Sequence, residues 1–242
     1  MLFKTFRPAA RTSRLKNATN VRGSREDYLK NRPANLVYLL HQRYSWMNPF
    51  LDGKETVIEV GSGSGFAKEF IHNKNLKLTD INKYEWIDRE VDALDTPFED
   101  ESVDAIIATN MIHHVARPLA FLKEMARILK PNGYLLIHEV HNSLLMKIIL
   151  VITRHEGWSY KDDVFDINTL SCDPDDPWSA NCAVPFLLFH DTKTFERHLS
   201  EFRVLKNELC EGLIFPLSGG VTAKIKTFRL PSALLKTIDR LD

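Results

Sequence analysis

The stretch that decides the fold runs from residue 57 to residue 70 and reads VIEVGSGSGFAKEF. Apolar and β-branched residues, typical of a buried strand, lead directly into glycines at Gly61, Gly63 and Gly65. The residues after the glycines, FAKEFIHN, have helical spacing. Each glycine removes a side chain where the backbone turns tightly or approaches a ligand. The stretch therefore predicts a strand, a turn and a helix, with a ligand at the turn.

The glycine spacing restricts what this turn can bind. The dinucleotide-binding pattern G-x-G-x-x-G/A needs a small residue at position 66, where this chain has Phe66. A phosphate-binding P-loop needs a Gly-Lys-Ser/Thr sequence, which does not follow the glycines. We therefore expect a nucleoside ligand without a large phosphate group.

Two carboxylates support a nucleoside site. Asp80 lies at the end of the predicted strand LKLTDI, 19 residues after Gly61, where a carboxylate can accept hydrogen bonds from both ribose hydroxyls. Glu59 precedes the glycines and adds a second negative charge to the same crevice. A cationic nucleoside suits these two charges better than a pyrophosphate does.

Strand-like and helix-like segments alternate on both sides of the glycines. Further strands are predicted at 76–81, 103–110 and 134–140, and helices begin at residue 33 and cover 118–129. This alternation predicts an α/β fold: a Rossmann-like, seven-stranded, mostly parallel sheet with helices on both faces. We expect a final antiparallel strand pair from 202–209 and 221–228. The alternation is lost after residue 141, which predicts an inserted lid over about 142–190.

Charge and composition limit the classes of partner. The 242 residues carry 32 basic and 32 acidic side chains, so the formal net charge is zero and we expect no stable nucleic-acid partner. Residues 1–25 nevertheless carry seven Lys and Arg and no acid, which predicts a basic N-terminal arm over 1–32 before a single domain over 33–242.

The longest apolar run, 144–152, is too short to span a bilayer. Three cysteines without metal or disulfide spacing fit a cytoplasmic protein, and the acids of 156–176 lack the spacing of a calcium loop, so we expect no metal.

Three longer stretches carry a resemblance to a known family. They are VIEVGSGSG at 57–65, VDALDTPFEDESVDAIIATNMIHHV at 91–115 and FLKEMARILKPNGYLLI at 121–137, with Asp80 between the first two. Together they resemble the class I S-adenosylmethionine-dependent methyltransferases, in particular the group with a type 11 methyltransferase domain. The resemblance covers about residues 55–140, and it implies that the nucleoside is S-adenosyl-L-methionine.

The resemblance also implies a role for individual residues. The loop residues Gly61, Ser62, Gly63 and Gly65 would pass beside the methionine part of the donor, and Glu59 would orient its ammonium group. Asp80 would hold the ribose, and Ile81 would pack on the adenine. Asp92 and the backbone of Ala93 would meet the adenine edge, while Asn110 and Met111 would border the sulfonium. This family often has Cys or Ala where Ser62 and Ser64 stand.

Each of these assignments has a plain structural alternative. The glycine cluster could be only a tight turn. Asp80 could start a helix as an N-cap, and Asp92 could cap a turn in a solvated loop.

The reaction needs a base only if the methyl acceptor is an un-ionised hydroxyl or an acidic carbon. Candidate bases follow the central strands, where ligands bind in open α/β sheets: His113, His114, Glu139 and His141. On a strand, Glu139 and His141 would share a face opposite to His138. The alternative is that His113 or His114 caps or packs the following helix.

The acceptor is predicted from the lid and the basic arm. His155, Trp158 and Tyr160, among seven acids in the lid, suggest a small-molecule acceptor with hydroxyls, a sugar or glycolipid intermediate. A quinone or fatty acceptor is the alternative, because Phe165 and the run 186–189 could line an apolar pocket. An RNA methyltransferase and a non-catalytic S-adenosylmethionine-binding protein also remain open. The basic arm, the apolar run 144–152 and the C-terminal tail could contact an anionic membrane surface. The alternative for the run 144–152, which we favour, is packing in the core.

Overall fold

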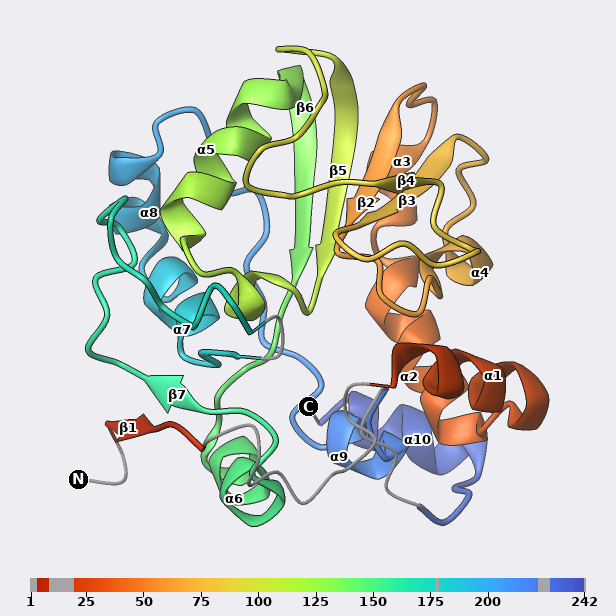
Figure 1. Ribbon diagram of the computed structural model, residues 1–242. Coiled ribbons are helices and arrows are strands. Elements are labelled where there is room, and N and C mark those ends of the chain that lie inside the picture. The colour runs from red at the N-terminus through yellow and green to blue at the C-terminus, as the bar shows by residue number, and fades with distance from the viewer. Residues whose placement is uncertain (1–3, 9–19, 177–178, 222–226, 242) are drawn as a thin grey trace.

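A five-stranded parallel sheet forms the centre of the computed structural model, which describes residues 4–8, 20–176, 179–221 and 227–241 (Figure 1). Its strands are β2 (Val57–Val60), β3 (Leu76–Asp80), β4 (Arg89–Glu90), β5 (Val103–Thr109) and β6 (Leu129–His138). They lie in the order β4-β3-β2-β5-β6, and each neighbouring pair is parallel. The strand order therefore reverses at β2, which opens a crevice at the carboxyl ends of β2 and β5.

The alternation of side chains along the central strands divides the core into two halves. Val57 of β2 and Ile107 of β5 belong to a cluster on one face of the sheet, whereas Ile58 and Ile106 belong to a cluster on the other. Both faces are buried, so these strands are apolar on both sides, as a sheet covered by crossover helices requires.

Helices cover both faces, as the sequence predicts. One cluster packs residues of α1 (Val21–Asn31), α2 (Ala34–Ser45), α3 (Asn48–Leu51), α4 (Ala67–Phe70), α9 (Ile214–Ser218) and α10 (Ser232–Asp239). The other packs residues of the 3-10 turn η2 (Ile112–His114), α5 (Pro118–Ile128), α7 (Val184–Phe189) and α8 (Thr192–His198). The α/β fold class with a parallel sheet is thus confirmed.

The insertion after β6 lies at the carboxyl end of the sheet, below it in Figure 1. It contains α6 (Leu144–Thr153) and β7 (Trp158–Ser159), and β7 pairs antiparallel with β1 (Thr5–Phe6). None of the described helices is long and apolar enough to cross a membrane.

The antiparallel pair is not where the sequence places it. Residues 202–209 form no strand, because the backbone N–H of Val204 donates to the Glu196 carboxylate instead of to a neighbouring strand. Of the segment 221–228, residues 222–226 lie outside the described part of the chain. The antiparallel pair is instead the separate ribbon of β1 and β7.

Part of the expected basic arm packs on the domain. Residues 21–31 form α1, which places Tyr28 in the core against Phe66. On the same helix, the Arg25 guanidinium donates to the backbone oxygen of Ser64 at 2.6 Å and lies over the Trp86 ring. Helix α1 therefore holds the glycine loop from outside.

Candidate active site

A single cavity of about 750 Å³ at the carboxyl end of the sheet brings together most of the residues that the sequence selects. Nine of the expected donor-binding residues line it: Gly61, Ser62, Gly63, Asp80, Ile81, Asp92, Ala93, Asn110 and Met111. The four candidate bases His113, His114, Glu139 and His141 also line it. Glu59 and Gly65 lie behind its wall and are not part of the lining.

Steric crowding explains two of the three loop glycines. All three have positive φ, and a Cβ on Gly61 would lie 2.9 Å from the Cβ of Met111. A Cβ on Gly65 would lie 2.6 Å from Trp86, so this glycine permits close packing and not ligand contact. At Gly63, by contrast, a Cβ would meet no heavy atom within 4 Å, which leaves the loop backbone open to a ligand.

Asp80 ties the glycine loop to the end of β3. One carboxylate oxygen accepts the Gly63 N–H at 2.8 Å, and the other accepts the Asn82 N–H at 2.8 Å. Bends and turns follow Asp80 rather than a helix, so it is not an N-cap. Its carboxylate still has acceptor capacity for ligand hydroxyls on the cavity side.

The residues expected around the adenine lie at the rim of the cavity. Ile81 is 57% exposed and belongs to the cavity lining, so it is accessible to a ligand there. Asp92 is exposed, and its carboxylate accepts the Leu94 N–H at 2.8 Å. Asp92 thus caps a turn in the loop, which is the structural alternative to adenine binding. It also belongs to the cavity lining.

Glu59 is fully enclosed behind the loop. One of its carboxylate oxygens accepts a hydrogen bond from the Tyr44 hydroxyl at 3.0 Å, and the other is buried without a hydrogen-bond partner among the described residues. Burial raises the pKa of Glu59 to about 8. Glu59 therefore carries a proton at neutral pH while no cation lies beside it.

Sequence reasoning missed a buried ion pair in the cavity wall. The Arg43 guanidinium donates two hydrogen bonds to Glu211, at 3.1 and 2.5 Å, and His138 lies 3.1 Å from the same carboxylate. Arg43 is on α2 and Glu211 follows 168 residues later, so no local pattern relates them. The opposite orientation of His138 relative to Glu139 agrees with the expected strand alternation.

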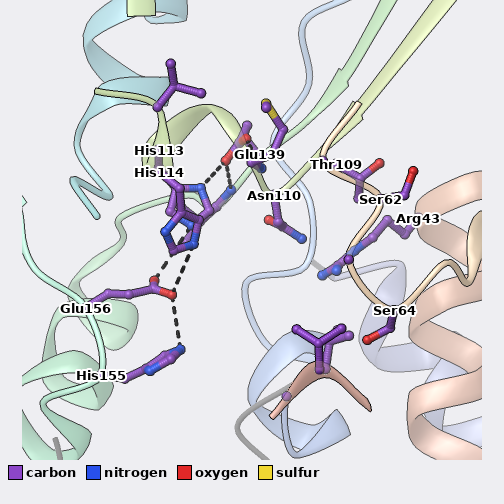
Figure 2. A pocket seen from close by; sticks show the side chains of 18 of the residues that line it. Arg43, Ser62, Ser64, Thr109, Asn110, His113, His114, Glu139, His155 and Glu156 are labelled. Carbon is purple, nitrogen blue, oxygen red and sulfur yellow. Dashed lines mark hydrogen bonds and ion pairs between the residues drawn. The ribbon is translucent and has the colours of Figure 1, made fainter. Parts of the chain in front are cut away.

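The second half of the cavity is built around His113. Its Nδ1 lies 2.5 Å from the carboxylate of Glu139, and that carboxylate also accepts the backbone N–H groups of Met111 and Ile112 (Figure 2). Burial lowers the pKa of His113, but the charge of Glu139 and the hydrogen bond to it outweigh burial and raise it. Glu139 therefore fixes the orientation of the His113 ring and favours its protonated form.

A second carboxylate, Glu156, faces the histidines from the lid (Figure 2). Its oxygens lie 3.8 Å from Nε2 of His113, 3.6 Å from Nε2 of His114 and 3.1 Å from Nε2 of His155. Burial raises the pKa of Glu156, but the hydrogen bond from His155 and the nearby imidazoles lower it well below its usual range. Burial lowers the pKa of His114 to about 4, so His114 is neutral at pH 7.

The aromatic residues that suggested an acceptor pocket lie elsewhere. Trp158 is buried against Phe6, and Tyr160 packs on Phe186, so neither lines the cavity. Phe165 and residues 186–189 also lie outside the lining. Phe165 and residues 187–189 pack in or against a core cluster, whereas Phe186 is 40% exposed and packs against Tyr160 and His190. From the lid, the cavity lining includes instead residues of α6, with His155, Glu156 and two of the acids, Asp173 and Asp176.

This sheet order, with a glycine loop after the central strand and a carboxylate at the end of the next, is that of a Rossmann-like fold that binds a nucleoside at the carboxyl ends of its strands. Comparison with known proteins agrees. Residues 58–137 match the family described as "Methyltransferase domain", and this segment is similar to the class I S-adenosylmethionine-dependent methyltransferases. The methyl donor of the class is S-adenosyl-L-methionine.

Several known proteins share part of this core. The chain is 29% identical over 154 residues to a highly reducing polyketide synthase, verA, of Penicillium polonicum, which covers 54% of this chain and 6% of that protein. It is 48% identical over 50 residues to the probable tRNA methyltransferase 9B of Homo sapiens, 19% of this chain and 11% of that protein. The solved YcgJ protein from Bacillus subtilis is 20% identical, with a TM-score of 0.37, over 46% of this chain and 56% of that one. The chain thus spans only a small part of the curated relatives it matches.

Proposed function

We propose that this chain transfers a methyl group from S-adenosyl-L-methionine to an oxygen of a small amphiphilic acceptor, such as a sugar or glycolipid intermediate. The observation that carries the proposal is the single cavity, in which the glycine loop and Asp80 face the same space as the His113–Glu139 pair. A donor held at the first group and an acceptor held at the second would meet near Asn110 and Met111, which follow β5.

The donor half suits a cationic nucleoside. Gly63 leaves its backbone open, and the Asp80 carboxylate lines the cavity beside it. The hydroxyl of Ser64, a residue of the cavity lining, is a buried polar atom without a hydrogen-bond partner among the described residues, so a polar ligand has a group to meet there. S-adenosyl-L-methionine, when bound, supplies a methyl group on a positively charged sulfur.

The acceptor half supplies a proton acceptor. In the neutral form of His113, Glu139 binds Nδ1 and leaves Nε2 to take the proton of an acceptor hydroxyl as its oxygen gains the methyl group; the raised pKa makes His113 a stronger base, which acts at pH values above that pKa. The positive charge lost at sulfur then appears on the imidazole, where Glu139 stabilises it. His113 is the proposed catalytic base, and Glu139 is a positioning residue.

The cavity wall favours an acceptor with a polar and an apolar part. Asp173, Asp176 and Ser143 offer groups for hydroxyls, whereas Met146 and Leu150 of α6 offer an apolar surface. The outer side of the same helix exposes further apolar residues, Leu144, Leu145, Ile148, Val151 and Ile152. We infer that α6 contacts a lipid surface from which the apolar part of the acceptor enters.

Methyl transfer to a cell extract tests the proposal. The chain is incubated with extract and methyl-labelled S-adenosyl-L-methionine, and the products are divided between organic and aqueous phases with and without nuclease. We expect nuclease-resistant label in an amphiphilic product, identified as a methyl ether by mass spectrometry. Nuclease-sensitive label would indicate an RNA acceptor, label on a quinone ring would indicate the lipid alternative, and the absence of transfer would indicate a non-catalytic binding protein. Each of these three results would overturn the proposal.

A further inference from the structure

Three imidazole rings surround one carboxylate at the acceptor end of the cavity. His113 and His114 project from η2, and His155 and Glu156 follow α6 (Figure 2). His113, His114 and Glu156 each offer one ligand atom, and these three atoms all lie within 4.8 Å of one another. The spacing of the acids in the lid predicted no metal, but the fold brings one of them to a histidine pair 42 residues earlier in the chain.

The separations of His113 and His114 from Glu156 are those of ligands that share an ion and not of hydrogen bonds. Oε2 of Glu156 lies 3.8 Å from Nε2 of His113, and Oε1 lies 3.6 Å from Nε2 of His114, which is too long for a hydrogen bond. Oε2 also accepts from the Cys182 thiol at 3.2 Å, and Oε1 lies 3.1 Å from Nε2 of His155. A tetrahedral ion with ligand atoms about 2.1 Å away holds neighbouring ligand atoms about 3.4 Å apart. We propose that His113, His114 and Glu156 bind one divalent transition-metal ion.

The surroundings of the three side chains orient them toward a common point. Nδ1 of His113 is bonded to Glu139, and Nδ1 of His114 lies 3.3 Å from the backbone oxygen of Ser179, so both rings turn Nε2 toward Glu156. His155 lies 3.1 Å from the Glu156 carboxylate on the other side. Metal-binding histidines characteristically donate their second ring nitrogen to a carboxylate or backbone oxygen, as both rings can here.

The ligand set determines the kind of ion. Two imidazole nitrogens and one carboxylate suit zinc, iron(II) or manganese(II) better than calcium or magnesium, which prefer oxygen ligands alone. All three side chains line the cavity, so the ion would have an open position toward an acceptor. In this respect the inference rests on the proposed function and changes one role in it: in the metal-loaded chain Nε2 of His113 would be a ligand, so an acceptor hydroxyl bound to the ion would release its proton to water and not to His113.

Metal content of the purified chain tests the site without reference to activity. The full chain is stripped with a chelator, loaded separately with Zn²⁺ and Co²⁺, freed of excess ion and analysed by elemental mass spectrometry and visible absorption. We expect one equivalent per chain and a Co²⁺ spectrum with nitrogen and oxygen ligation. His114→Ala and Glu156→Gln should each weaken binding at least tenfold, whereas His72→Ala, at an exposed histidine, should retain full binding.

Two results would overturn the metal site. One is less than a tenth of an equivalent in the wild-type chain, and the other is equal metal content in the wild type and a folded Glu156→Gln variant, with folding checked by circular dichroism. Titration of the stripped protein with S-adenosylhomocysteine separates this inference from the proposed function. Donor binding without metal binding rejects the ion alone, and metal binding without donor binding rejects the methyltransferase proposal.

Discussion

At the scale of single residues, Glu59 behind the glycine loop is a buried carboxyl group with one oxygen that lacks a hydrogen-bond partner among the described residues. Its other oxygen accepts a hydrogen bond from Tyr44. Burial raises its pKa to about 8. A cation beside Glu59 would favour the ionised form and draw the pKa down again.

Glu59→Gln should alter the pH dependence of stability. Between about pH 4.5 and pH 8 the folded state holds a proton that the unfolded state releases, so the free energy of unfolding falls as pH rises through this window. Glutamine keeps an oxygen for Tyr44 and does not titrate. We expect the variant to match the wild type near pH 5 and to exceed it at pH 8.5 by on the order of 4 kcal/mol.

Urea unfolding at both pH values measures this difference. Subtracting the wild-type curve removes the contribution of the other titrating groups, which the two proteins share. Parallel pH profiles for the two proteins would show that Glu59 is ionised in the folded state.

His113 and Glu139 should affect turnover and not donor affinity. His113→Gln removes the proton acceptor, and we expect the rate of methyl transfer to fall about 10²–10⁴-fold. Glu139→Gln should give a smaller loss, because glutamine can still accept a backbone hydrogen bond but no longer stabilises the imidazolium. Single-turnover rates and S-adenosylhomocysteine titration measure the two effects, with His72→Ala as the exposed control. An unchanged rate in His113→Gln would remove His113 from the chemistry.

At the scale of elements, the glycine loop depends on what packs behind it. Gly65→Ala would place a Cβ 2.6 Å from the Trp86 ring at a φ of +67°, whereas Gly53→Ala has a φ of +68° and no atom within 4 Å. Both substitutions carry a backbone strain of about 1–2 kcal/mol, and only the first adds a clash, worth about 1–3 kcal/mol. Thermal or chemical denaturation should therefore show a clearly larger loss for Gly65→Ala. Equal losses would mean that Trp86 moves aside freely.

The sequence predicted the elements whose apolar pattern is contained in one short segment. It did not predict the elements that form only by pairing with a distant segment. The run VIEV is apolar on both faces and became the central strand β2, and the periodic segment 118–128 became α5. Residues 202–209 have strand propensity, but the structure gives them no neighbouring strand, so propensity alone did not form one. The antiparallel pair formed from two-residue strands, β1 and β7, which are too short to have a sequence pattern.

At the scale of the whole molecule, the fold joins two halves of one cavity, and the sequence predicts the residues of one half better than those of the other. The donor half follows from a compact motif and one acid at a fixed distance, so nine of its eleven expected residues line the cavity. On the acceptor side the candidate bases were named, but Glu156, which faces His113 and His114, was not, because it comes from a separate segment. The Arg43–Glu211 pair was missed for the same reason. Only the folded chain shows that Glu139 pairs with His113 while Glu156 faces it from the lid.

The central claim is that the glycine loop and Asp80 bind the methyl donor, and calorimetric titration with S-adenosylhomocysteine tests it most directly. We predict one site per wild-type chain and a 10- to 100-fold weaker affinity for Asp80→Ala, since charge-assisted hydrogen bonds to the ribose contribute about 1.5–3 kcal/mol. Asp95→Ala, in the exposed loop nearby, should bind as the wild type does. Absence of binding to the wild-type chain, or equal affinity of Asp80→Ala and the wild type, would contradict the account.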